Sequence, residues 1–206
     1  RRYLLSIDSL PSKPLIAFVP MSLRTDNSVA GNQLSFVLAN LGTHLDDPLS
    51  RIELIHRSMN NGKHRFRRMN QAQVINYSVI SYAWEGINLA TGLFPKKQAF
   101  NLLISNVPGS EKPLYWNGAR LQSLYPASIV FNGQAMNITL ASYLDKIEFG
   151  ITACSKALPH VQDMLVLIEE ELQLLERTSK ELEFQGITVT DKSRDKENGK
   201  TKKLAP

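Results

Sequence analysis

Apolar and polar positions follow two different periods along this chain of 206 residues. Residues 15–23 (LIAFVPMSL) form a nearly continuous apolar run, which is typical of a strand buried on both faces inside a sheet. Pro20 lies near the end of this run, where a strand tolerates proline best. The helix expected before it, RRYLLSIDSL, is broken by the prolines of residues 10–14, and a second apolar run, LSFVLANLG, follows Gly31-Asn32.

Helical spacing of apolar residues predicts three longer helices. The first starts at Asp46-Asp47-Pro48, because an aspartate accepts hydrogen bonds from first-turn amides and proline suits the first helical position. Its residues expected to face the core are Leu49, Ile52, Ile55 and Met59. The second helix covers residues 72–89, with one face formed by Val74, Tyr77, Ile80, Ala83 or Trp84, and Ile87. The third starts near Pro159, with its stripe formed by Val161, Met164 or Leu165, Ile168, Leu172 and Leu175.

Between Phe100 and Ala153 the pattern changes to short strand-like runs separated by turn signals. Asn117-Gly118 is the strongest hairpin signal, because both residues accept a positive φ angle. Asn132-Gly133 predicts a second turn and Asp145-Lys146 a third. We therefore expect an antiparallel meander that joins the strand at residues 15–23.

Composition and charge limit the class of protein. Hydrophobic residues make up 43% and charged residues 21%, which fits a soluble globular chain with a core, and no apolar run approaches the roughly 18 residues that cross a bilayer. Residues 187–206 hold six Lys/Arg and three Asp/Glu, so this tail carries +3 of the net charge of +5. The basic balance is therefore weak evidence for a nucleic-acid partner, and none is expected. Cys154 is alone, so no intrachain disulfide is expected, which favours a reducing cytosol.

The sequence contains no recognisable catalytic or metal-binding motif. Its four histidines are scattered, without HxxxH or CxxC, so no metal site is expected and each histidine fits a surface or hydrogen-bonded structural role. Spacing alone leaves a Ser-His-Asp arrangement open, but GxSxG, GxGxxG and the GxxxxGK phosphate loop do not occur.

The basic segment Lys63–Arg68 (KHRFRR) holds five cationic or potentially cationic side chains in six residues. Two interpretations remain open for it. It forms either a solvated helix face or a docking patch for phosphates or anionic lipid headgroups.

Two polar segments are candidates for a substrate channel. Ser105-Asn106-Val107-Pro108-Gly109 leaves an apolar strand and enters a rigid turn, so Asn106 either stabilises that turn or shapes a channel at the end of the sheet. Tyr125-Pro126-Ala127-Ser128 is similar, and Tyr125 either lines an apolar channel or packs against the core.

These residues carry a resemblance to a known family. ISNVPGSEKPLYWNGARLQSLYPASIVFNGQAMNITLASYLDKIEFGITA resembles the C-terminal domain of the bacterial wax ester synthase/diacylglycerol acyltransferases. FVPMSLR and GNQLSFVLANLGTHLDDPLSRIELIH are similar to the start of that domain, and PHVQDMLVLIEEELQLLE is similar to its closing helix. The resemblance extends from Leu15 to Leu175 in one register.

The resemblance implies an α/β (α+β) fold like that of chloramphenicol acetyltransferase and other CoA-dependent acyltransferases. In that fold a mixed sheet is flanked by helices, and two such halves meet along a tunnel. It also implies transfer of a fatty acyl group from acyl-CoA, which is a substrate and not a cofactor, to a long-chain alcohol or to diacylglycerol. The family's HHxxxDG motif, whose second histidine acts as general base, lies in the N-terminal half.

This sequence contains no HHxxxDG, so no catalytic residue is expected in it, and its expected partner is an N-terminal half that carries the motif. The expected organisation is a helix end or linker at residues 1–14, the acyltransferase domain at 15–184 and a disordered basic tail at 185–206. A cytoplasmic location is expected, with peripheral attachment to the inner membrane or to lipid inclusions.

The family's acyl-chain selectivity position corresponds to Ala135, although a small residue after a tight turn also explains this alanine. The candidate substrate-binding residues are Ala135, Ser105, Asn106, Tyr125, Ser128, Gly133, Met136 and Asn137. The candidate CoA-binding residues are Arg24 and Asn32. Two alternatives remain: a non-catalytic, membrane-adjacent interaction module that uses the basic segment and the tail, and a condensation-type enzyme that takes carrier-bound acyl groups.

Overall fold

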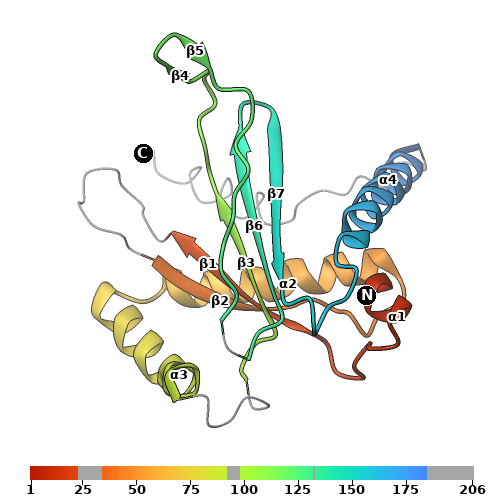
Figure 1. Cartoon of the computed structure of the whole chain (residues 1–206). Helices are drawn as coiled ribbons and strands as arrows, with labels where there is room; N and C mark the ends of the chain where they lie inside the picture. The colour runs from red at the N-terminus through yellow and green to blue at the C-terminus, as the bar shows by residue number, and fades with distance from the viewer. Residues whose placement is uncertain (23–33, 92–97, 132, 185–206) are drawn as a thin grey trace, which may run out of the picture. The chain divides into compact units, whose positions relative to one another are not determined.

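The computed structural model describes residues 1–22, 34–91, 98–131 and 133–184, which divide into two compact units (Figure 1). The first unit, residues 1–161, holds a five-stranded sheet, the helices α1 (Arg2–Ser6), α2 (Pro48–Arg67) and α3 (Gln71–Thr91), and a small hairpin. The second unit holds helix α4 (Asp163–Phe184), which starts four residues after Pro159. The predicted tail and the candidate CoA-binding residues Arg24 and Asn32 lie outside the described residues.

The sheet is mixed, as the family resemblance implies, with the strand order β2-β1-β3-β6-β7. Its strands are β1 (Ile16–Ser22), β2 (Leu34–Asn40), β3 (Leu102–Val107), β6 (Met136–Tyr143) and β7 (Lys146–Ala153). Strands β1 and β2 pair antiparallel, as do β6 and β7, whereas β3 is parallel to both β1 and β6.

The predicted antiparallel meander is therefore wrong at β3. A period of two residues identifies a strand but does not give the direction of its neighbour. Parallel neighbours need a long crossover connection, and residues 108–135 supply one between β3 and β6.

Two of the predicted turns join paired strands. Asn117 and Gly118 have φ angles of 47° and 81° and connect β4 (Tyr115–Trp116) to β5 (Ala119–Arg120), which form a separate two-stranded sheet. The turn between β6 and β7 contains Leu144, with φ of 54°, and Asp145.

The turn predicted at Asn132-Gly133 has a different role. Gly133 has a φ angle of 83°, and the amide of Gln134 donates to the carbonyl of Phe131 across 3.0 Å. This turn closes no hairpin, because residues 121–131 form no strand. Asn132 itself lies outside the described residues.

The proline in β1 is placed where a strand can accept it. Pro20 pairs with Phe36 of β2, but the parallel pairing of β1 with β3 involves only Ala17 and Phe18. Because Pro20 lies beyond that parallel pairing, its missing N–H interrupts no ladder between β1 and β3.

Helix α2 begins where the aspartate-proline signal predicts. Asp47 is the N-cap, and its Oδ2 accepts hydrogen bonds from the backbone amide of Ser50 at 2.8 Å and from the Ser50 hydroxyl at 2.6 Å. These bonds, the hydroxyl first, lower the pKa of Asp47 below its ordinary value. The cap therefore stabilises the helix above the carboxyl's unfolded-state pKa, and this contribution is lost as the pH falls through the folded-state pKa.

The buried face of α2 differs from the predicted one. Leu49 and Ile52 are 40% and 44% exposed, so the prediction that they face the core is wrong. Met59 does pack against the core, as predicted. Small residues make two further close contacts with β2: the Ser58 hydroxyl accepts from the amide of Asn40 at 3.0 Å, and Gly62 lies directly against Val37. A helix approaches a sheet most closely through such residues, and a search for apolar spacing passes over them.

Helix α3 packs through its first turns. Val74 is buried in one cluster with Val37 of β2 and Phe66 of α2, and Tyr77 packs against this cluster. Farther along the same predicted face, Ile80 is 79% exposed. Within the described residues, no helix is long and apolar enough to cross a membrane.

The two faces of the sheet differ in chemistry. The face toward α2 carries an apolar cluster of Ala17, Ala39 and Leu102, against which Met59 of α2 packs. On the opposite face Phe18 stacks on Phe36, with ring centroids 4.5 Å apart, and lies 4.7 Å from the ring of Phe100. This opposite face, called the polar face below because of its side chains on β3 and β6, holds the candidate site.

We expect Gly62→Ala to destabilise the protein by about 1–3 kcal/mol, although alanine normally favours a helix over glycine. A Cβ atom at Gly62 would lie 2.4 Å and 2.8 Å from the two γ-carbons of Val37. The matched control is Gly86→Ala in α3, where a Cβ meets nothing within 4 Å and a gain of up to about 1 kcal/mol is expected. Thermal unfolding of both variants measures the difference, and equal midpoints would contradict the packing described for α2.

Candidate functional site

A chain of hydroxyl groups joins three segments on the polar face. Ser105 of β3 and Thr139 of β6 are register partners, and the Ser105 hydroxyl donates to Thr139 Oγ1 at 3.3 Å. Thr139 Oγ1 also lies 2.6 Å from the hydroxyl of Ser128, which belongs to the connection between β3 and β6. Thr139 is 5% exposed, so these contacts satisfy a hydroxyl that is shielded from water.

Asn137 extends this network and holds the connection against the sheet. It is buried, its Nδ2 donates to the carbonyl of Ile129 at 2.9 Å, and its Oδ1 accepts from Thr139 at 3.3 Å. Nearby, the carbonyl oxygen of Pro126 would lie 1.8 Å from a Cβ atom at Gly150 of β7. Residues 126–129 therefore lie directly on β6 and β7, and Gly150 permits the close approach.

Ala135 faces the same side as this network. Its carbonyl accepts from the amide of Cys154 at 2.9 Å, which continues the β6–β7 ladder by one pair. Because side chains alternate along a strand, Ala135, Asn137 and Thr139 share one face. Ala135 is half-buried, so an added side chain at this position would meet the surroundings of the network.

The other candidate residues lie elsewhere. Met136 faces the apolar cluster beneath α2, and Asn106, which pairs with Leu140, also points away from the polar face and is exposed. Tyr125 is 73% exposed. At Gly133 a Cβ atom would lie 1.7 Å from Gln98 Nε2, so the glycine is required by its neighbour as well as by its positive φ.

Two important residues escape the motif search. Thr139 joins the candidate hydroxyls, and Tyr143 holds the base of the β4–β5 hairpin: its hydroxyl donates to the carbonyl of Leu121 and accepts from the amide of Leu114, each at 3.0 Å. Both lie on the side of β6 opposite Met136, Ile138 and Leu140. Polar side chains that alternate with these apolar residues are the sequence signal that could have found them.

Gly109 explains the Pro-Gly turn after β3. A Cβ atom there would lie 1.8 Å from the carbonyl oxygen of Ser142, and the Gly109 amide donates to the Ser142 hydroxyl at 3.0 Å. The chain thus leaves β3 in contact with the end of β6.

Residues 108–131, called the arm below, first extend past the ends of β3, β6 and β7 to the β4–β5 hairpin at the tip and then return along the sheet (Figure 1). The arm carries many apolar side chains that the described residues leave open to solvent. Trp116 at the hairpin is 82% exposed. The other exposed large hydrophobic residues are Leu114, Tyr115, Leu124, Tyr125, Ile129 and Phe131. Single exposed hydrophobic residues are ordinary at a protein surface, but seven within residues 114–131 are more than such scatter accounts for.

The histidines do not form a catalytic or metal-binding arrangement in the described part of the chain. All four are exposed, and within the described residues the ring of His56 forms hydrogen bonds only with Asn60. No group of three His, Cys, Asp or Glu side chains that could hold a metal ion occurs among the described residues.

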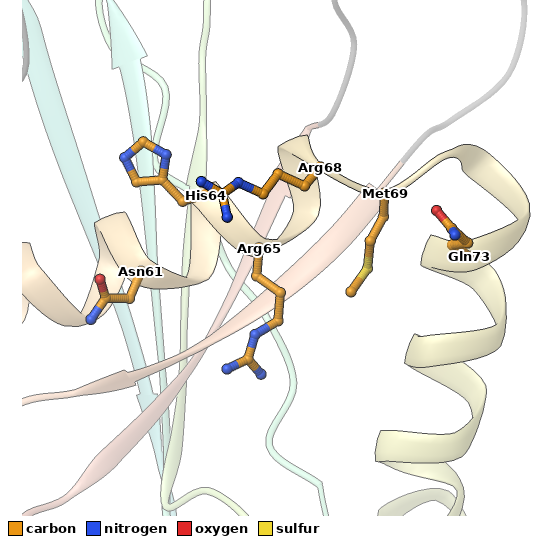
Figure 2. Close-up of a pocket in the computed structure, with 6 residues that line it drawn as sticks. All are labelled: Asn61, His64, Arg65, Arg68, Met69 and Gln73. Carbon is orange, nitrogen blue, oxygen red and sulfur yellow. The ribbon is translucent and has the colours of Figure 1, made fainter. Parts of the chain in front are cut away.

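The basic segment lies beside a surface pocket of about 790 Å³ at the junction of α2 and α3 (Figure 2). Its lining residues are Asn61, His64, Arg65, Arg68, Met69 and Gln73. All of them except the half-buried Met69 are exposed, so the pocket is open to solvent.

Thr139→Val is expected to destabilise the protein by about 1–3 kcal/mol, because the valine keeps the shape but leaves Ser128 and Asn137 without their shared partner. The matched control is Thr152→Val on the same face of β7, where the described residues hold no hydrogen-bond partner for the hydroxyl. Its effect should stay within about 0.5 kcal/mol. Denaturant unfolding compares the two, and similar losses would show that the network adds no stability.

Comparison with known proteins reveals close relatives. A relative from Acinetobacter baylyi, named O-acyltransferase WSD, is 58% identical over 176 residues, which are 85% of this chain and 38% of that protein. A relative from Mycobacterium tuberculosis, named as a diacylglycerol O-acyltransferase, is 46% identical over 179 residues, which are 86% of this chain and 40% of that protein. The chain thus spans about 40% of the length of these relatives.

A solved structure agrees. The wax ester synthase/diacylglycerol acyltransferase from Marinobacter aquaeolei VT8 matches with a TM-score of 0.75 and 42% identity, over 86% of this chain and 40% of that one. The expected CoA-dependent acyltransferase fold is thereby confirmed. The family model described as the WS/DGAT C-terminal domain matches residues 30–176. This chain therefore belongs to the WS/DGAT C-terminal domain family.

Proposed function

We propose that this chain forms the C-terminal half of an O-acyltransferase that moves a fatty acyl group from acyl-CoA to a long-chain alcohol or to diacylglycerol. The observation that carries this proposal is the family match over residues 30–176, together with the 58% identity to the Acinetobacter relative. Because the match covers only part of each relative, the activity is proposed for the complete enzyme.

The chemistry assigns the proton transfer to another part of that enzyme. A general base removes the proton of the acceptor hydroxyl, the oxygen attacks the thioester carbonyl, and the CoA thiolate leaves. All four histidines of this chain are exposed, and among the described residues no hydrogen bond joins one of them to the hydroxyl network. The proposed base is therefore the second histidine of an HHxxxDG motif in an N-terminal half.

The proposed contribution of this chain is one wall of the substrate channel. The half-buried Ser105 and Ser128 supply hydroxyls that the buried Thr139 holds in place, and Ala135 supplies a small apolar position on the same face. A rigid wall with few polar groups suits a long acyl chain, because such pockets are largely apolar with a few positioned donors and acceptors. Tyr125 belongs to this proposal through the arm, and Gly133 through the turn before β6, whereas Met136 faces the opposite side of the sheet.

The arm is the proposed contact with the N-terminal half. Its exposed apolar residues, including Tyr115 and Trp116, are of the types enriched at protein interfaces. The proposal also includes Arg24 and Asn32 as CoA ligands and a peripheral position at the inner membrane or lipid inclusions, where the lipid acceptors reside.

The test of the function is acyl transfer by the complete enzyme. Supplied with palmitoyl-CoA and either hexadecanol or dioleoylglycerol, it should form wax ester or triacylglycerol. The control is the same enzyme with the second histidine of its HHxxxDG motif replaced by alanine. Activity with an acyl group on a carrier protein, and none with palmitoyl-CoA, would instead indicate a condensation-type enzyme.

The size of residue 135 is expected to set the length of chain that the enzyme prefers. Ala135→Val and Ala135→Phe should shift preference toward shorter acyl or alcohol chains, and Ala135→Gly toward longer ones, because each added carbon shortens an apolar pocket. In such a pocket, one methylene more or less on the substrate changes kcat/KM by about 10- to 200-fold. The control is Ala153→Val, since Ala153 pairs with Met136 at the same end of the sheet but faces the opposite side. An unchanged preference in all three variants would remove the proposal.

A further inference from the structure

We propose that the pocket at the junction of α2 and α3, called the basic pocket below, binds a phosphate group of an anionic ligand. Asn61, His64 and Arg65 reach it from the last turns of α2, and Gln73 from the first turn of α3 (Figure 2). Arg68, the C-cap of α2, also lines it; its side chain points toward His64, and that of Arg65 points away from them (Figure 2). The choice of ligand rests on the function proposed above, which supplies two sources of this chemistry: the phosphates of CoA and the headgroups of anionic phospholipids.

The positive charge of this region is not balanced locally. Between Glu53 and Glu85 the sequence has five Lys/Arg residues and no Asp or Glu. Within the described part of the chain, no carboxylate pairs with the arginines of the pocket, whereas Arg1 pairs with Asp46. Mixed charge is the usual state of a solvated surface, so a region of one sign only favours an anionic ligand.

Arg65 is held in place before any ligand arrives. Its Nη1 donates to the hydroxyl of Tyr77 at 2.6 Å, and its guanidinium carbon lies 5.7 Å from the centre of the Tyr77 ring. Tyr77 in turn packs edge-on against the buried Phe66, with centroids 5.7 Å apart. A guanidinium has five N–H donors, and this contact uses one, so a fixed fork remains available to phosphate oxygens at a reduced entropic cost.

The start of α3 adds to the site. Asn70 and Gln73 cap it reciprocally: Asn70 Oδ1 accepts from the Gln73 amide and Gln73 Oε1 accepts from the Asn70 amide, each at 2.9 Å. The first turn of this 21-residue helix contains no acidic residue. The partial positive charge of a helix N-terminus therefore has the same sign as the neighbouring arginines.

The alternative explanation of the basic residues is that they complement the C-terminal dipole of α2. That explanation covers His64, Arg65 and Arg67, which lie in the last turn. It does not require Arg68 to line a pocket with Arg65, and it does not require acidic residues to be absent from the first turn of α3. A phosphate site explains the basic last turn of α2, the position of Arg68 at the pocket and the lack of acidic residues in the first turn of α3.

Arg68→Gln in the complete enzyme tests the proposal, with Lys13→Gln as a control that removes one exposed charge elsewhere. Calorimetry measures binding of CoA and of 3′-dephospho-CoA, and sedimentation measures binding to vesicles of phosphatidylglycerol and of phosphatidylcholine. Loss of one charge-assisted contact should weaken binding about tenfold. If R68Q weakens binding of CoA more than binding of 3′-dephospho-CoA, the ligand is the 3′-phosphate of CoA. A loss confined to phosphatidylglycerol vesicles identifies the headgroup.

The double variant R65Q/R68Q, with K13Q/K156Q as its control, should enlarge the same loss. R65Q/R68Q also removes the hydrogen bond from Arg65 to Tyr77, which can disturb folding. R68Q alone avoids this problem, because the Arg68 side chain is exposed and makes no hydrogen bond among the described residues. Binding of every probe at control strength would overturn the proposal. If acyl transfer succeeds while R68Q matches its control, the pocket fails and the proposed function stands. If acyl transfer is absent while R68Q weakens phosphate binding, the proposed function fails and the pocket stands.

Discussion

Strand β3 pairs in parallel with β1 on one side and with β6 on the other, and the positions of the other elements of the sheet unit follow from this. Parallel neighbours cannot be joined by a tight hairpin, so both connections must cross over the sheet. The first contains β2, α2 and α3 and places α2 over one face. The second contains the arm and lays residues 126–129 on the other face. One face is therefore a helix-covered apolar core, while the other can carry polar groups.

The polar groups of that second face are retained because the arm satisfies them. A buried hydroxyl or amide without a partner costs about 1–3 kcal/mol, and Thr139 and Asn137 find partners in Ser128 and the carbonyl of Ile129. The same bonds fix where the arm runs. Polar side chains on this face thus determine the course of a segment whose own residues form little regular structure.

Signals that act between neighbours in sequence were predicted well. The Asp47 cap and the Asn117-Gly118 hairpin depend on a few adjacent residues, and the structure confirms both. Partners distant in sequence were not predicted. Alternation along β3 is the same for parallel and antiparallel neighbours, and two of the close contacts of α2 with β2 involve Ser58 and Gly62, which apolar spacing does not identify. For the site, Ser105, Ser128 and Asn137 were selected as separate polar residues, and only the fold reveals that Thr139 joins them.

Hydroxyl and amide groups of this kind cannot serve as the general base of the proposed acyl transfer. A base that works at neutral pH needs a pKa near 7, and an unperturbed serine or threonine hydroxyl remains protonated there. The half-buried Ser105 and Ser128 are the members of the network proposed to orient a substrate, because a hydroxyl donates and accepts hydrogen bonds without changing charge. The basic pocket, proposed above to bind a phosphate, lies on the other connection, where α2 meets α3. The proposed phosphate site and the proposed channel wall therefore belong to different crossovers of β3.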